Sequence, residues 1–261
     1  MDAPDERKDG AVVQSNEVRH LHPTSDPAAR VVHTFDREML ILKRRLVREA
    51  RYAIAMLERA LDALWRLDAE AAMEVRLRDD RVDEEEVAIE QDCYRLLALK
   101  QPVARDFRII AFILKVNADI ERVADHASSI AKIAKKMRRD PPPRWPQSLR
   151  EMGERVPLMC YQLLRAVMSE DAVSARAVVE MDETIDQLNR QLFGETVEMM
   201  RRDPEACADG LLISRAGREL ERVGDLMTNI AEDVVFLATG EIIRHQKRRA
   251  EAQARQATPP A

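Results

Sequence analysis

The chain has 261 residues, of which 34% are charged and only 4% aromatic, and its formal net charge is −5. This length allows one large or two modest domains, and the composition favours long helices over sheets, which prefer aromatic and β-branched residues. The negative charge argues against a nucleic-acid binder, and no apolar run approaches the roughly 20 residues that span a bilayer. Three widely spaced cysteines and a polar start without a leader pattern predict a cytoplasmic protein with buried, reduced thiols.

The first 32 residues are polar, contain three prolines and show no periodicity. This pattern predicts a disordered arm. His20 and His22 in the arm could in principle bind a metal ion, but a solvated segment is the favoured interpretation.

Three helices are predicted in the first half of the chain, because apolar residues recur at helical spacing over residues 36–67, 69–99 and 103–138. Asp68 is placed to cap the second of these helices. Gln101-Pro102 separates the second helix from the third, since proline disfavours helix in the residue before it.

The second half repeats this plan after a proline-rich linker, residues 141–146, which cannot continue a helix. Helices are predicted over residues 147–168 and 171–201. A last helix begins at the capping pair Asp203-Pro204 and ends at the glycine of Thr239-Gly240.

An internal duplication unites the two halves. Residues 119–131, DIERVADHASSIA, return one hundred positions later as residues 219–231, ELERVGDLMTNIA. The predicted fold class is therefore all-α, with two tandem antiparallel three-helix bundles related by internal duplication. The expected organisation is a disordered arm (1–32), a first bundle (33–140), a linker (141–146), a second bundle (147–243) and a flexible tail (244–261).

Two adjacent helices in each half carry acidic residues four positions apart, so each pair projects from one face of its helix. The pairs on the third helix of each half lie roughly opposite the apolar stripe, and the pairs on the middle helices flank it. Neighbouring helices could therefore bring four carboxylates together in each half. The residues concerned are Glu121, Asp125, Asp79 and Asp83 in the first half, and Glu221, Asp225, Asp182 and Asp186 in the second.

Carboxylates gathered in this way repel one another and raise one another's pKa, a conflict that a bound multivalent cation removes. Oxygen ligands suit hard ions such as Mg²⁺, Ca²⁺ and Mn²⁺, and carboxylate-bridged iron is also compatible. A single acidic pair is a weak signal in so acidic a chain, because Arg122 and Arg222 would form ordinary surface ion pairs with the glutamates beside them. The recurrence of both pairs in the same register favours a metal site.

Two other interpretations stay open. The first is a structural helical-bundle scaffold without bound metal, whose carboxylates form only solvated ion pairs. The second is a di-metal enzyme, which is disfavoured because the Glu-x-x-His spacing of di-iron bundles occurs only at Glu17–His20, in the arm. No phosphate-binding loop or nucleophile pattern is present. His126 is not supported as a further ligand, since its counterpart is Leu226, and we expect a half-exposed histidine there.

Five segments of the chain form a specific combination. They are HTFDREM at 33–39, KQPVARDFRII at 100–110, IERVADHASSIA at 120–131, LERVGDLMTNIAED at 220–233 and ATGEIIRH at 238–245. Together these segments resemble the PhoU family of phosphate-signalling regulators. The resemblance runs in order through nearly the whole folded region and implies a fold of two three-helix bundles.

The resemblance also implies the E(D)xxxD motif with which this family holds multinuclear metal clusters. The motif falls here on Glu121, Asp125, Glu221 and Asp225, beside the four aspartates of the neighbouring helices, and the candidate ions are Mn, Mg, Fe and Zn. Leu226 departs from the first copy and suggests that the two sites need not be equivalent.

The role that the resemblance implies is a non-enzymatic one. It is that of an adaptor between the ATPase subunit of a phosphate ABC transporter and a phosphate-sensing histidine kinase. Such an adaptor restrains phosphate uptake and phosphate-starvation genes when phosphate is plentiful. A monomer and a homodimer joined through shared ions are both compatible with the sequence.

Overall fold

The computed structural model describes residues 27–137 and 141–243, which form α-helices and one 3₁₀ turn without any β-strand. Residues 39–261 form one compact unit, and residues 1–38 belong to a separate unit. The elements are α1 (Pro27–Arg66), α2 (Ala69–Lys100), α3 (Ala104–Lys136), α4 (Gln147–Ser169), α5 (Ala172–Arg202), η1 (Pro204–Ala206) and α6 (Cys207–Thr239).

The predicted helix ends agree with the structure within two residues, except at the starts of α1 and α6. Helix α1 begins at Pro27, well before the predicted Asp36, because proline is tolerated in the first turn of a helix. Before α6, Pro204 opens a separate 3₁₀ turn, and α6 itself starts at Cys207. The rest of the predicted arm and the whole tail, residues 244–261, lie outside the described residues.

Side chains and glycine terminate the helices as the sequence predicts. The Asp68 carboxylate accepts hydrogen bonds from the backbone N–H groups of Glu70 and Ala71, at 3.0 and 2.9 Å. Asp171 caps α5 in the same way, and Gly240 ends α6 with a φ of +77°. These contacts satisfy polar groups that a helix leaves without partners at its ends.

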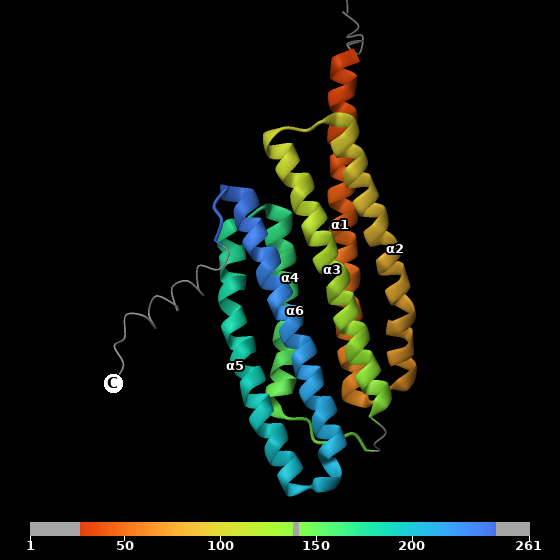
Figure 1. The fold of residues 1–261 in the computed structure, drawn as a ribbon, viewed down its shortest axis with the longest axis vertical. Helices are drawn as coiled ribbons and strands as arrows, with labels where there is room; N and C mark the ends of the chain where they lie inside the picture. The colour runs from red at the N-terminus through yellow and green to blue at the C-terminus, as the bar shows by residue number, and fades with distance from the viewer. Residues whose placement is uncertain (1–26, 138–140, 244–261) are drawn as a thin grey trace, which may run out of the picture. The chain divides into compact units, whose positions relative to one another are not determined.

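The two predicted bundles are confirmed, and they lie side by side (Figure 1). Helix α2 packs on α3, while α4, α5 and α6 pack on one another, and α3 also packs against α6. Apolar side chains of α1, α3, α4 and α6 meet along this junction between the bundles, and α2 and α5 lie on its outer sides (Figure 1). Each side chain fully buried there stabilises the fold by about 1.5–3 kcal/mol.

Polar contacts between α3 and α6 fix how the bundles face one another. The Lys115 ammonium lies 2.8 Å from the Asp233 carboxylate. Further along α3, His126 Nδ1 lies 2.8 Å from Glu219 Oε2 on α6. The side chains of Asp233 and Glu219 are 8% and 14% exposed, whereas that of Lys115 is 47% exposed. Each contact therefore has a carboxylate that is largely shielded from solvent, and the two contacts favour one register of α3 against α6.

The linker between the bundles is anchored by the two tryptophans of the chain. Trp145 is buried, and its ring meets that of Trp65 edge-on at 5.3 Å between centroids. Its Nε1–H also donates a hydrogen bond to the carbonyl oxygen of Trp65. Helix α4 passes close to this pair at Gly153, where an added Cβ would lie 2.6 Å from the Trp65 ring.

The expectation of buried thiols is confirmed for two cysteines and wrong for the third. Cys93 and Cys160 are buried, and burial raises the pKa of each thiol to about 12. Cys207 is exposed, because it is the first residue of α6 and lies at the end of the bundle. No helix in the described part of the chain is both long and apolar enough to cross a bilayer.

Candidate metal-binding clusters

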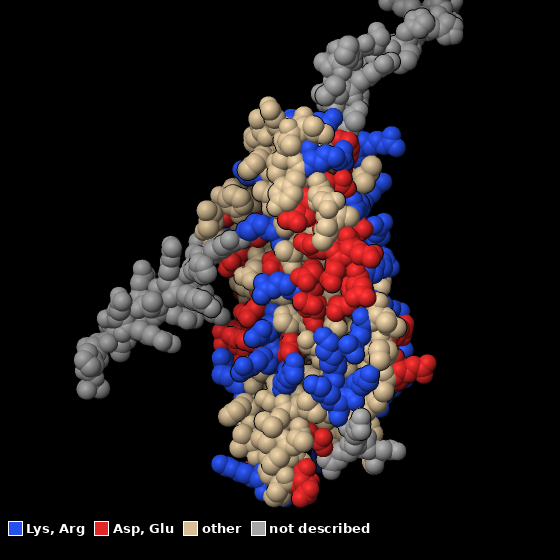
Figure 2. Space-filling view, turned by 45° about the vertical axis from the view of Figure 1, so that its right-hand side comes forward, with Lys and Arg blue, Asp and Glu red and all other residues tan. Residues whose placement is uncertain are grey.

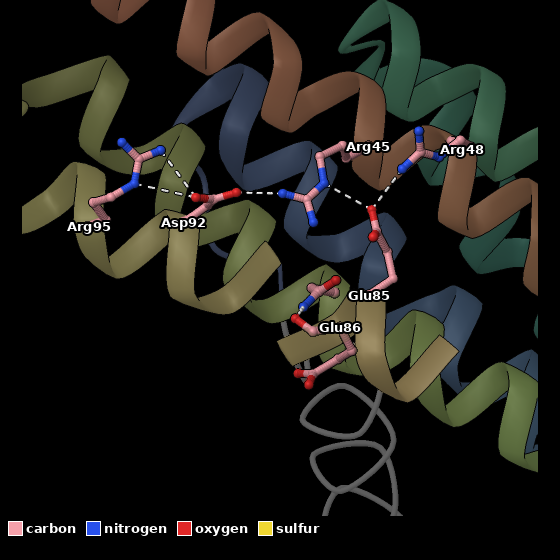
Figure 3. A network of polar contacts seen from close by, with 7 residues as sticks. Arg45, Arg48, Glu85, Glu86, Asp92 and Arg95 are labelled. Atoms are coloured by element: carbon pink, nitrogen blue, oxygen red, sulfur yellow. Dashed lines mark hydrogen bonds and ion pairs between the residues drawn. The ribbon is translucent and has the colours of Figure 1, made fainter. Parts of the chain in front are cut away.

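The acidic run of α2, residues 79–86, divides between two faces of the helix. Glu85 points toward α1, where it accepts hydrogen bonds from Arg45 and Arg48 at 2.9 Å each (Figure 3). The hydrogen bond from Arg45 is the main cause that lowers the pKa of Glu85. Glu86 points away from these arginines (Figure 3), and burial together with Glu90 and Asp83 raises its pKa. Adjacent glutamates therefore serve different purposes, one in an α1–α2 ion network and one beside α3.

Carboxylates from α2 and α3 come together on one side of the first bundle. Glu121 shows this most clearly, because burial and the negative charges of Asp125, Asp83, Glu86 and Asp79 raise its pKa to about 7. The predicted four residues are thus close enough to repel one another across the two helices. We call these side chains the first cluster: Asp79, Asp83, Glu86, Glu121 and Asp125.

The first cluster has little basic charge near it: Lys132 lowers the pKa of Asp79, but as the smallest of the causes that act on that group. Within the described residues, none of its five carboxylates forms an ion pair with a lysine or arginine. Acidic side chains gather on the face of the molecule turned toward the viewer in Figure 2, above a patch of basic ones. Ordinary surface ion pairs therefore do not account for this cluster, although they do account for Glu85 and Asp92 on the other face of α2.

Asp79 provides a test of whether a cation fits the first cluster. Its Oδ1 atom is buried and has no hydrogen-bond partner in the described structure. Burial raises the pKa of Asp79, and Ser128 lowers it in part, although the Ser128 hydroxyl does not reach hydrogen-bond geometry. Asp125 and Asp83 raise the pKa further. A buried oxygen that lacks a donor and faces other carboxylates suits a hard cation.

The carboxylates of the first cluster are not arranged as a complete coordination shell for one ion. In the described part of the chain, no three or more Asp, Glu, His or Cys side chains are arranged as a ready set of ligands for one ion. The residues that could hold a cation are therefore gathered on one surface, and small side-chain rotations would be needed to bring their oxygens onto a common point.

The matched residues of the second bundle also come together. Burial raises the pKa of Glu221, and the charges of Asp225 and Asp186 add to this effect. Asp182 lies against α6, since a Cβ added at Gly224 would be 3.6 Å from its Oδ1. We call these side chains the second cluster: Asp182, Asp186, Glu221 and Asp225.

Basic side chains border the second cluster. Arg218 and Arg222 lower the pKa of Glu221 and so oppose the effect of the neighbouring carboxylates. Both arginines line a hollow of about 680 Å³ together with Asp182, Glu221 and Asp225. The second cluster is therefore a mixed-charge surface, unlike the first.

Some residues of these clusters were not predicted from the sequence. Glu86 lies three positions after Asp83 and seven after Asp79, so helical spacing could have placed it on the same face. Arg218 precedes Glu221 by three positions and could have been found in the same way, whereas the partial burial of Asp79 beside Ser128 depends on how α2 packs against α3.

His126 differs from the prediction of a half-exposed side chain. It is only 12% exposed, because its ring lies against Glu219 of the other bundle. Burial acts to raise the pKa of Glu219, but His126 and Arg215 outweigh it, so that the pKa is lowered overall. His126 therefore contributes to the α3–α6 contact rather than to the first cluster.

The chain matches the PhoU domain twice, over residues 46–134 and 149–234, which correspond to the two bundles. It is 37% identical over 185 residues to a protein of Deinococcus radiodurans described as "Phosphate-specific transport system accessory protein PhoU homolog". That match covers 71% of this chain and 87% of the relative. A relative of the same description from Pseudomonas aeruginosa is 37% identical over 187 residues, which cover 71% of this chain and 77% of the relative.

Solved structures have the same fold. The crystal structure of PhoU from Pseudomonas aeruginosa superposes with a TM-score of 0.76 at 34% identity, covering 79% of this chain and 100% of the other. The crystal structure of the phosphate transport system regulatory protein PhoU from Streptococcus pneumoniae gives 0.75 at 31% identity, with 80% and 99% covered. Two matched domains, the sequence identity and the shared fold together show that this chain belongs to the PhoU family.

Proposed function

We propose that this protein is a non-enzymatic regulator of phosphate uptake and of phosphate-starvation signalling. It acts as a metal-binding adaptor between the ATPase subunit of the phosphate ABC transporter and a phosphate-sensing histidine kinase. The relatives support the first part, because they are described as accessory proteins of the phosphate-specific transport system. The acidic clusters support the second part, since they provide a surface whose charge a cation would change.

The observation that carries the proposal is the unpaired carboxylate set of the first cluster. Glu121, with a pKa raised to about 7, and Asp79, with a buried oxygen that lacks a donor, both gain from a nearby positive charge. Asp83, Glu86 and Asp125 complete the set of oxygens that would hold the ion. A bound cation would neutralise the cluster and tie α2 to α3. The second cluster would tie α5 to α6 in the same way.

Metal content tests the site assignment. The double variant Glu121→Ala/Asp125→Ala should lose the metal of the first cluster while its circular dichroism stays that of a helical protein. Asp80→Ala/Glu84→Ala is the matched control, because it removes two exposed carboxylates at the same spacing from α2. Elemental analysis of protein purified without chelator should show a loss only in the first variant. Unchanged metal content in Glu121→Ala/Asp125→Ala would show that the assignment is wrong.

Partner capture tests the adaptor role. The metal-loaded protein should retain the transporter ATPase and the kinase cytoplasmic domain in a pull-down, and Glu121→Ala/Asp125→Ala should retain less of both. If the variant and the chelator-treated protein retained as much of both partners as the metal-loaded parent does, partner binding would not depend on the metal clusters.

A scaffold without bound metal is the alternative function. It is favoured by one observation, that no ready set of three ligands exists among the described residues. On this alternative, the thermal midpoint of unfolding should be the same with chelator and with added Mn²⁺. On the adaptor proposal, Mn²⁺ should raise the midpoint, since a ligand that binds only the folded state stabilises it.

A further inference from the structure

A groove opens where three helix ends meet beside α1. The first turns of α3 and the last turns of α4 and α6 enclose it, and its volume is about 420 Å³. The floor is apolar and includes the buried side chains of Ile109, Phe112 and Leu237. This volume lies in the range typical of small-molecule sites. We refer to it as the seam groove.

The seam groove continues in two directions. Inward, Leu46 and Val167 are shared with a void of about 40 Å³ between the bundles, whose wall includes Cys160. Outward, Met168, Glu170 and Leu237 are shared with a shallower hollow of about 440 Å³. The three spaces therefore adjoin one another between the surface and the apolar junction of the bundles, and an extended apolar chain lying in the seam groove would contact apolar side chains along its length.

The rim of this path is basic. Glu170 is the single acidic side chain among the described residues that line the groove and the hollow, and it binds Lys43 at 3.1 Å and Arg105 at 2.7 Å. The remaining rim cations form no ion pair in the described structure. They are Arg44, Arg51 and Arg108.

Helix dipoles explain only part of this positive charge. The Arg108 guanidinium lies over Gly240 at the C-terminal end of α6, where a cation is favoured. Arg44 and Arg51 lie in the middle of α1, far from either end of that helix. Both line the groove and form no ion pair in the described structure, so their charge is complementary to an anion that enters it.

Exposed apolar side chains border the same rim. Leu40 and Met168 are 47% and 57% exposed, and both line the seam groove. Apolar surface beside unpaired cations fits a molecule that carries an anionic group and an aliphatic part. A free phosphate ion would satisfy the arginines but would leave the apolar floor uncovered.

We propose that the seam groove binds one long-chain acyl anion, a fatty acid, with its chain on the apolar floor and its carboxylate at Arg44 and Arg51. The chain's own residues 244–261 do not suit this place, because they carry five lysines and arginines and only one acidic residue. A second copy of this surface would bring like charges together.

Calorimetric titration with dodecanoate, below its micelle concentration, tests the proposal. The expected result is one molecule bound per chain. Butyrate has the same head without the chain, and dodecyltrimethylammonium has the same chain with the opposite charge. Each should bind at least about tenfold more weakly, because each lacks one of the two complementary features. Equal binding of the ammonium compound would overturn the proposal.

Two variants locate the binding site. Arg44→Glu/Arg51→Glu should weaken dodecanoate binding by at least about tenfold. The control Arg201→Glu/Arg202→Glu, at the opposite end of the second bundle, should bind as the parent does. Val167→Phe, which narrows the groove, should also weaken binding while the circular dichroism remains helical. Undiminished binding by Arg44→Glu/Arg51→Glu would overturn the assignment.

Vesicles distinguish a free ligand from a membrane. Phosphatidylglycerol vesicles should compete poorly with dodecanoate for the groove. If vesicles bind through Arg44 and Arg51 while free dodecanoate does not, the site is a membrane contact and the free-ligand proposal is wrong.

Discussion

The two acidic clusters stand at matched places in the duplicated chain but differ in their electrostatics. In the first, no carboxylate is paired with a basic side chain in the described structure, and the pKa of Glu121 is raised to about 7. In the second, Arg218 and Arg222 lower the pKa of Glu221 and oppose the effect of burial and of the neighbouring carboxylates. The counterpart of Arg218 is Ala118, and the counterpart of Glu86 is Asn189. The repeat therefore determines where the carboxylates lie, whereas a few neighbours determine how strongly each cluster attracts a cation.

The largest expected effect is on Mn²⁺ affinity, when carboxylates are replaced by amides of the same shape. Glu121→Gln/Asp125→Asn should weaken Mn²⁺ binding at the first cluster by roughly 100-fold, because two unpaired charges are lost. Glu221→Gln/Asp225→Asn should weaken binding at the second cluster by only about tenfold, since arginines already offset its charge. Calorimetry on each variant measures both constants. Equal losses of Mn²⁺ affinity in the two clusters would contradict the proposed effect of the arginines on the second cluster.

Exchanging the residue types at positions 118 and 218 should make the Mn²⁺ affinities of the two clusters more alike. Ala118→Arg places a guanidinium where Arg218 stands in the second half, and it should weaken Mn²⁺ binding at the first cluster by about fivefold. Arg218→Ala should strengthen binding at the second cluster by a similar factor. Both positions are exposed, so the fold should tolerate the changes. Unchanged constants would show that these neighbours do not tune the clusters.

The pH dependence of stability should also distinguish the clusters when chelator is present. The folded-state pKa of Glu121 is raised from 4.5 to about 7, so the folded state binds its proton more tightly than the unfolded state does. Stability should therefore fall as pH rises through this interval, by about 1 kcal/mol after allowance for solvent screening.

Urea unfolding at pH 5 and pH 8 measures this effect. Glu121→Gln should reduce the loss of stability between the two pH values, and Glu221→Gln should change it less. A loss that is the same in parent and Glu121→Gln would mean that other groups cause it.

The smallest effect concerns the helix backbone beneath the second cluster. Gly224 corresponds to Ala124 in the first half, and a Cβ at Gly224 would meet its neighbours only at ordinary contact distances of 3.5 Å or more. Gly224→Ala should therefore stabilise the protein by about 0.5–1 kcal/mol, because alanine favours helix. Ala124→Gly should destabilise it by a similar amount. Thermal unfolding measures both, and a destabilising Gly224→Ala would show that Asp182 needs the space.

Local patterns were sufficient to predict most of the fold. The helices follow from apolar spacing, and their ends follow from Asp68, Asp171 and Gly240. The start of α1 was missed because residues 1–32 were predicted to be a disordered arm, from their polarity, their three prolines and their lack of periodicity, although a proline in the first turn is compatible with helix. Spacing on a single helix also placed the carboxylates correctly on neighbouring helices of each bundle.

The contact between the bundles could not be predicted in this way. It depends on how α3 is rotated against α6, and periodicity within one helix carries no information about that rotation. The Lys115–Asp233 and His126–Glu219 pairs arise from it, and so does the seam groove. For the same reason, helical spacing could not predict that His126 would lie against Glu219 or that Trp145 would anchor the linker.

The tryptophan pair gives the protein a built-in optical reporter. Trp65 and Trp145 are the two tryptophans of the chain, and both lie where the linker meets α1. Their fluorescence therefore comes from a single locus rather than from an average over the molecule. A red shift in emission at constant far-ultraviolet dichroism would indicate that the hinge between the halves has loosened while the helices stay intact. Separation of the bundles on metal or partner binding could thus be followed without an added dye.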